Sequence, residues 1–227
     1  MNPDLIREIT TWVLPVLIAI TFHEAAHGFV AWKCGDDTAY MLGRVTFNPL
    51  KHIDPFGTIL LPAMLLYAGG FLFGYAKPVP VNFRRLHHPR RDMVLVAAAG
   101  PGVNLLLAVA SGLLIHAVRL TPVWFSEWGA ATLINSIYLN VILALFNMFP
   151  LLPLDGGRVL AGLLPLSLAR PFARTERYGI LIVIALIFLP DVMWRQTGVD
   201  INILGWILGP ARDYVVHLIA LITGLGG

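Results

Sequence analysis

The sequence predicts an all-α polytopic membrane protein with about five or six transmembrane helices. Of its 227 residues, 57% are hydrophobic and 13% are charged, whereas soluble domains carry about 25% charged residues. Apolar runs approach the length of about 20 residues that crosses a bilayer as a helix. The net charge is only +3, and the basic residues lie in loops, which indicates membrane orientation and gives no reason to expect a nucleic-acid partner.

The first predicted helix runs from about Leu5 to Lys33 and contains the motif around which the chain is organised. Residues 20–28 are apolar apart from Thr21 and an H-E-x-x-H pattern at His23, Glu24 and His27. Residues four apart lie on one helix face, so the two histidines can bind one metal ion. A lone histidine here would more often be a satisfied interior residue, but the pair with an intervening glutamate in an apolar helix indicates a metal site.

The segment after this helix is mixed in character. Residues 40–47 are rich in β-forming side chains around Gly43, and they predict a short membrane-associated hairpin, with a plain loop as the alternative. Residues 56–76 are apolar but contain proline and glycine, so they form either a full span or a re-entrant hairpin. Residues 77–92 hold five Lys or Arg side chains, which places this loop in the cytoplasm by the positive-inside rule.

Further spans are predicted at 93–118, 130–149 and 178–189. Four arginines within 158–177 predict a second cytoplasmic loop. Residues 201–225 form either a last span or a helix along the membrane interface, because Pro210, Arg212 and Asp213 interrupt the apolar run.

We expect one intramembrane metalloprotease domain over residues 1–227. Its catalytic core covers about 5–160, and accessory helices occupy 161–227. The single cysteine, Cys34, excludes an intrachain disulfide and a cysteine-based zinc cage.

Asp155 is the predicted third metal ligand. Catalytic zinc usually takes three protein ligands, and loop charges predict that the first helix runs inward, the second outward and the third inward. The ends of the first and third helices then meet on the cytoplasmic side, provided that 56–76 does not cross the membrane fully. Asp155 lies at that depth between Pro153 and Gly156-Gly157, where the backbone can approach a metal or substrate closely. A simple helix-ending turn is the alternative for this stretch.

Two asparagines in apolar helices are candidates for substrate handling. Asn104 and Asn147 carry amide donors that could stabilise an oxyanion or bind the substrate backbone. The alternative is hydrogen bonding between helices, which polar residues commonly provide in membranes.

Several stretches of the sequence carry a family resemblance. They read H-E-A-A-H at 23–27, N-P-L-K-H-I-D-P-F-G-T at 48–58, K-P-V-P-V-N at 77–82, A-G-P-G-V-N at 99–104 and N-M-F-P-L-L-P-L-D-G-G-R at 147–158. Together they resemble the site-2 protease family of intramembrane metalloproteases, in particular its short bacterial members. The resemblance covers most of residues 15–160.

The resemblance implies one zinc ion held by His23, His27 and Asp155, with Glu24 as the catalytic carboxylate. It also implies a substrate role for Asn147, a less defined role for Asn104, and a membrane-associated strand region after the first helix. Transmembrane-helix proteins are the implied substrates, cut to release a regulator. The chain differs from larger members in lacking a PDZ-like insertion and a C-terminal regulatory domain, so membrane helices, residues 38–76 or a regulatory membrane partner would control access.

The sequence therefore predicts an intramembrane zinc endopeptidase of the plasma or inner membrane, with its active site toward the cytoplasm. The alternative from another class is a membrane metal-binding or transport protein that uses the same ligands without proteolysis. Glu24 discriminates between the two, because only a protease needs a general base there. A catalytically inactive scaffold is disfavoured by the complete ligand set and intact Glu24.

Overall fold

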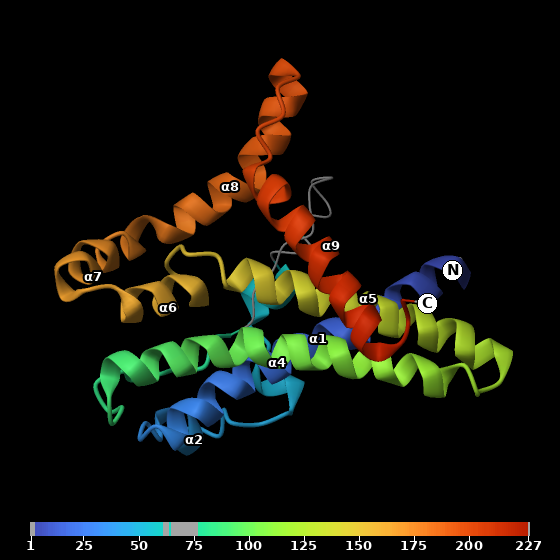
Figure 1. Cartoon of the computed structure of the whole chain (residues 1–227), viewed down its shortest axis with the longest axis horizontal. Helices are drawn as coiled ribbons and strands as arrows, with labels where there is room; N and C mark the ends of the chain where they lie inside the picture. Colours follow the sequence, from blue (N-terminus) through green and yellow to red (C-terminus); the bar gives the residue numbers. More distant parts are fainter. Residues whose placement is uncertain (1–2, 61–63, 65–76, 227) are drawn as a thin grey trace.

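The computed structural model describes residues 3–60, 64 and 77–226, and within them every regular element is a helix (Figure 1). The elements are α1 Pro3–Lys33, α2 Thr38–Met41, η1 Pro49–Lys51, η2 Pro55–Leu60, α4 Pro89–Val118, α5 Val123–Asn147, α6 Asp155–Leu163, α7 Leu166–Ala173, α8 Glu176–Thr197 and α9 Ile203–Thr223. The prediction of an all-α protein is confirmed for this part of the chain.

Four of these helices are long and apolar enough to cross a membrane. They are Ile6–Lys33, Pro89–Val118, Val123–Asn147 and Glu176–Thr197. The described residues thus contain four candidate spans, and the predicted total of five or six for the whole chain stays a prediction. The predicted last span at 201–225 is a helix, α9, but is not among the four, and its apolar run is interrupted by Pro210 and the Arg212–Asp213 pair. Most of residues 56–76 lie outside the described residues, and so does the choice between a span and a re-entrant hairpin.

Helices α1, α4 and α5 form the central bundle, in which α4 runs antiparallel to the other two (Figure 1). At one end, Arg7 on α1 pairs with Glu127 on α5 at 3.5 Å. At the other end, the amide of His87 donates to the carbonyl of Cys34 at 2.8 Å. The chain thus leaves α1 and enters α4 at the same end of the bundle. The C-terminal ends of α1 and α5 share that end, as the loop charges predicted.

The predicted hairpin at 40–47 is wrong, because this segment consists of the short helix α2 followed by turns. Side-chain contacts with the end of α1 outweigh the β propensity of the segment. The ring of Tyr40 stacks on Trp32 with centroids 4.5 Å apart. The buried Arg44 donates to the carbonyl of Lys77 at 2.7 Å, so the segment packs against residues 77–82 through a side chain and without a strand ladder.

The C-terminal helices pack around this bundle to different extents. Helices α8 and α9 form a helical hairpin whose apex projects from the bundle, and α9 returns to pack on α4 and α5 (Figure 1). The predicted fourth span at 178–189 lies within α8. The shorter helix α6 packs on α4 and begins at Asp155. This helix therefore brings the third predicted ligand to α1.

Candidate metal centre

Three side chains converge at the contact between α1 and the start of α6. His23 and His27 lie on consecutive turns of α1, and their Nε2 atoms are 3.1 Å apart. The Oδ2 atom of Asp155 lies 3.2 Å from Nε2 of His23 and 3.3 Å from Nε2 of His27. Both histidines are buried and Asp155 is half-buried. The structure therefore brings together the three residues that the sequence singled out as ligands.

The hydrogen bonds of the two imidazoles indicate which nitrogen carries the proton. Nδ1 of His27 is 2.7 Å from the carbonyl oxygen of Val96, which can only accept, so this nitrogen is the donor. Nδ1 of His23 is 2.5 Å from Oδ1 of Asn104, which is again an acceptor. Both Nε2 atoms are then left with a lone pair that points into the centre of the cluster.

This arrangement fits a zinc ion. The two Nε2 lone pairs face the buried Oδ2 of Asp155, which has no hydrogen-bond partner among the described residues. Three electron-pair donors in mutual contact repel one another unless a cation lies between them. Ligand atoms at 2.0–2.1 Å from a tetrahedral zinc are spaced by about 3.3 Å. The observed spacings of 3.1 to 3.3 Å agree with that value.

Gly100 on α4 makes room for both imidazoles. A Cβ atom built at this position would lie 2.5 Å from Nε2 of His27 and 2.6 Å from Nε2 of His23. Any larger residue would therefore displace the ligands or push α4 away from α1. The sequence motif at 99–104 contained this glycine, but its steric role becomes visible only when the helices are packed.

Two glycines place Asp155 at the start of α6. A Cβ at Gly156 would lie 2.1 Å from the carbonyl oxygen of Met148, and one at Gly157 would lie 2.5 Å from the backbone of Leu151. The chain between α5 and α6 thus folds back tightly on the first turn of α6. The predicted break in the helix is confirmed, and the close approach that these glycines allow is to the chain's own backbone.

Glu24 is held by a contact that the sequence reasoning missed. Its Oε2 accepts a hydrogen bond from the backbone amide of Val79 at 2.7 Å. Val79 is buried and lies between Pro78 and Pro80 in a stretch without regular secondary structure. The amide of Asn82 in turn donates to the buried carboxylate of Asp36 at 2.6 Å. Residues 77–82 therefore form an anchored segment that orients the carboxylate of Glu24.

The two predicted asparagines lie in different surroundings. Asn104 is fully buried behind His23, and its amide nitrogen donates to Oδ1 of Asn140 at 2.7 Å. Its donor is thus engaged away from the cluster, and Asn140 is a further polar residue that the sequence reasoning did not select. Asn147 is half-buried at the end of α5 and donates to the carbonyl of Leu143 at 2.9 Å. Its substrate role stays a prediction.

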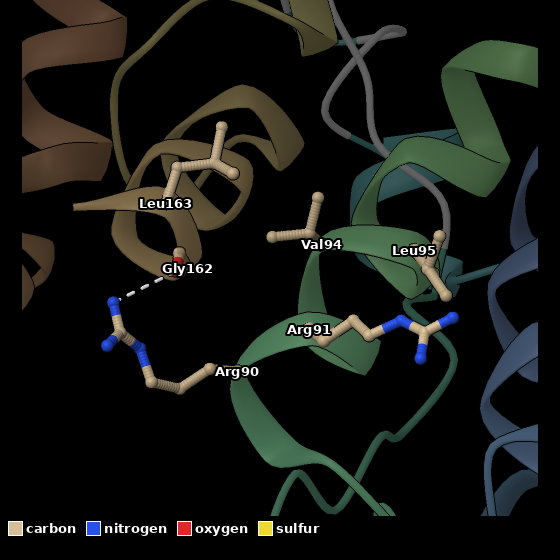
Figure 2. A pocket seen from close by; sticks show the side chains of 6 residues that line it. All are labelled: Arg90, Arg91, Val94, Leu95, Gly162 and Leu163. Atoms are coloured by element: carbon tan, nitrogen blue, oxygen red, sulfur yellow. Dashed lines mark hydrogen bonds between the residues drawn. The ribbon is translucent and has the colours of Figure 1, made fainter.

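A pocket beyond the cluster lies between the start of α4 and the end of α6, as Figure 2 shows. Its lining residues are Arg90, Arg91, Val94, Leu95, Gly162 and Leu163. Arg90 donates to the carbonyl of Gly162 at 3.1 Å and also to that of Leu164. None of the three candidate ligands lines this pocket, and Arg90 there ties the far end of α6 to α4.

Comparison with known proteins connects this cluster to a peptidase family. The family model described as Peptidase family M50 matches residues 11–190. A Bacillus subtilis protein named "Putative zinc metalloprotease YwhC" is 38% identical over 225 residues, which cover 92% of this chain and 91% of that protein. Proteins with the same description and the name Rip2 are 31% identical in Mycolicibacterium smegmatis and 30% identical in Mycobacterium tuberculosis. Those alignments cover 77% and 78% of this chain and 65% and 66% of the relatives. No solved structure matches the chain.

Proposed function

The chain belongs to peptidase family M50, and from that premise we propose that it is an intramembrane zinc endopeptidase. Its reaction is the hydrolysis of a peptide bond within or near a transmembrane helix of a membrane-protein substrate. The observation that carries the proposal is the convergence of His23, His27 and Asp155 next to Glu24, in a bundle of candidate membrane spans.

Zinc bound by His23, His27 and Asp155 would supply Lewis-acid polarisation of the scissile carbonyl and activation of water. Glu24 is the general base that takes a proton from the attacking water and returns it to the leaving amine. The amide of Val79 holds one oxygen of this carboxylate at 2.7 Å, and we assign the proton transfer to the other oxygen. Asn147, at the end of α5, is the candidate group for binding the substrate backbone or the oxyanion.

A helical substrate hides its peptide bonds in backbone hydrogen bonds, so it must unwind locally before attack. Helix-breaking residues near the cut site should therefore help cleavage. The lipid bilayer and the substrate helix are the expected partners, together with a regulatory membrane protein. Basic residues in 77–92 and 158–177 support a location in the plasma or inner membrane with the site toward the cytoplasm.

The test is cleavage of a model transmembrane substrate by the purified protein in detergent, with zinc content measured in parallel. We expect Glu24→Gln to retain zinc and to lose cleavage by at least ~100-fold, because it removes the base and leaves the ligands. Asp155→Ala should lose both zinc and cleavage, since it removes a ligand.

Two outcomes would overturn the proposal. Equal cleavage by the wild type and Glu24→Gln would exclude the assigned mechanism. Tight zinc binding by a wild-type protein that cleaves none of a panel of transmembrane substrates would favour a metal-binding or transport protein instead.

A further inference from the structure

A network of buried polar side chains leads away from the candidate metal centre into the contact between α4 and α5. Asn104 on α4 and Asn140 on α5 are both fully buried, with 0% of their surface exposed. Asn140 donates to the carbonyl oxygen of Ser136 at 2.9 Å, and the hydroxyl of Ser136 lies 2.8 Å from that of Ser111. Polar groups this deep in an apolar bundle are costly unless each has a partner.

The partners determine the direction of the hydrogen bonds that lead from the carbonyl of Ser136 to His23. The carbonyl of Ser136 can only accept, so the amide nitrogen of Asn140 must face it. The remaining oxygen of Asn140 then faces Asn104 and accepts from its amide nitrogen at 2.7 Å. That nitrogen also lies 3.4 Å from the carbonyl of Ala19, which again only accepts.

The oxygen of Asn104 is therefore the atom that meets His23. It accepts from Nδ1 of His23 at 2.5 Å, which places the imidazole proton on Nδ1 and leaves Nε2 to bind metal. If the amide of Asn104 were rotated by half a turn, its NH₂ group would face Nδ1. The ring would then carry its proton on Nε2, in the middle of the three ligand atoms.

We propose that Asn140 is a positioning residue for the metal site. It holds the amide of Asn104 in the one orientation that accepts from His23, and it thereby sets the tautomer and ring orientation of a zinc ligand from the neighbouring helix. This inference rests on the proposed function, since it deepens the account of the same zinc site. It also explains a difference between the two histidines. The Nδ1–H of His27 is oriented by one backbone carbonyl, that of Val96, whereas the Nδ1–H of His23 is oriented by Asn104, which is itself held by Asn140.

The alternative is that the asparagines only hold α4 and α5 together. Ser111→Ala is a matched control for that role. It removes a buried hydrogen bond between the same two helices, at the end of the network away from Asn104. Asn140→Asp is a conservative variant, because a neutral carboxyl group can accept from Asn104 and donate to Ser136 in the same pattern. Asn140→Leu has a similar shape and can do neither.

The experiment measures zinc affinity by competition with a chelator, in the full-length protein in detergent and without any substrate. We expect Asn140→Leu to bind zinc about 10-fold more weakly, the lower end of the effect of losing an outer-shell partner. Asn140→Asp and Ser111→Ala should stay within about twofold of the wild type by the same scale. Equal weakening by Ser111→Ala and Asn140→Leu would overturn the proposal, because it would indicate helix packing alone.

A second measurement reads the tautomer directly. The method is nitrogen NMR of the metal-free protein with labelled imidazole rings, in which the His23 signals are assigned by substitution. The wild type should carry a proton on Nδ1 of His23. Asn140→Leu should lose this preference for Nδ1. A wild-type His23 ring whose only proton lies on Nε2 would overturn the proposal, even if Asn140→Leu failed to fold. Neither measurement uses proteolysis, so an absence of cleavage would refute the proposed function and leave this inference standing.

Discussion

The proposed metal-binding side of the site (the ligand side) and the proposed general-base side (the base side) are held in different ways, although both begin on α1. His23 and His27 lie directly against Gly100 of the regular helix α4. Glu24, on the same turn as His23, is oriented by one backbone amide, that of Val79 in the irregular segment 77–82. The candidate ligands thus depend on close packing between helices, whereas Glu24 accepts from a single donor among the described residues.

This difference predicts that the two halves fail separately. The ligand side should be sensitive to added volume, because packed helices have no spare space at that point. The base side should be sensitive to the loss of the Val79 amide N–H that donates to Glu24, and tolerant of a changed side chain at Val79. Substitutions can therefore remove metal binding, or slow proton transfer with the metal still bound.

Gly100→Ala should have the largest effect. The added methyl group would lie 2.5 Å from Nε2 of His27 and 2.6 Å from Nε2 of His23, so both imidazoles must move out of the position in which they converge. We expect zinc affinity to fall by ~100-fold, at the upper end of effects transmitted through a ligand's surroundings. Chelator competition measures the affinity, and cleavage should fall in parallel.

Gly102→Ala is the matched control for this substitution. It lies two residues further along α4, where an added Cβ meets nothing within 4 Å. This variant should bind zinc like the wild type and gain the ~0.5–1 kcal/mol that alanine contributes over glycine in a helix. A Gly100→Ala protein that bound zinc as tightly as Gly102→Ala would contradict the packing account of the ligand side.

Val79→Pro should have the next largest effect, confined to catalysis. Proline removes the amide N–H that donates to Glu24. It suits a position that already precedes a proline, because such a position is biased toward extended backbone. A hydrogen bond to a charged group contributes roughly 1.5–3 kcal/mol. We therefore expect kcat/KM for a transmembrane substrate to fall ~10–100-fold, with zinc content unchanged.

Val79→Ala separates the amide from the side chain. It keeps the N–H donor but removes methyl groups that pack near Gly28. Its kcat/KM should stay within about threefold of the wild type, since the bond to Glu24 is intact. Equal losses in the two Val79 variants would show that side-chain packing, and not the amide, orients the base.

The convergence of the three candidate ligands could be predicted from the sequence, because its signals are carried by side chains. The spacing of His23 and His27 is local to one helix, and loop charges placed Asp155 at the same end of the bundle. The structure brings these three residues together within 4.8 Å. The role of Gly100 could not be predicted in this way, since it depends on how closely α4 approaches α1.

The base side could not be predicted in full, because its key contact is made by a backbone amide. Every residue except proline supplies such a donor, so Val79 has no side-chain signal of its own. The one available clue was that Pro78 and Pro80 leave Val79 as the sole amide donor of the three. The predicted hairpin at 40–47 was wrong for a related reason, since contacts with α1 decided the conformation of that segment.

Arg90→Gln should have the smallest effect and tests how far the rigidity of the ligand side extends. Arg90 is exposed and donates to the carbonyls of Gly162 and Leu164, at the end of α6 opposite to Asp155. Loss of a cation at a helix C-terminus costs about 0.3–1 kcal/mol, so thermal unfolding in detergent should show a slightly lower Tm. Zinc affinity should not change, because Gly156 and Gly157 already seat the first turn of α6 against the preceding loop.

Arg91→Gln is the control, since Arg91 lines the same pocket but extends away from α6 (Figure 2). A fall in zinc affinity in Arg90→Gln alone would mean that Asp155 is placed by the whole length of α6, and the ligand side would then be less self-contained than its packing against Gly100 indicates.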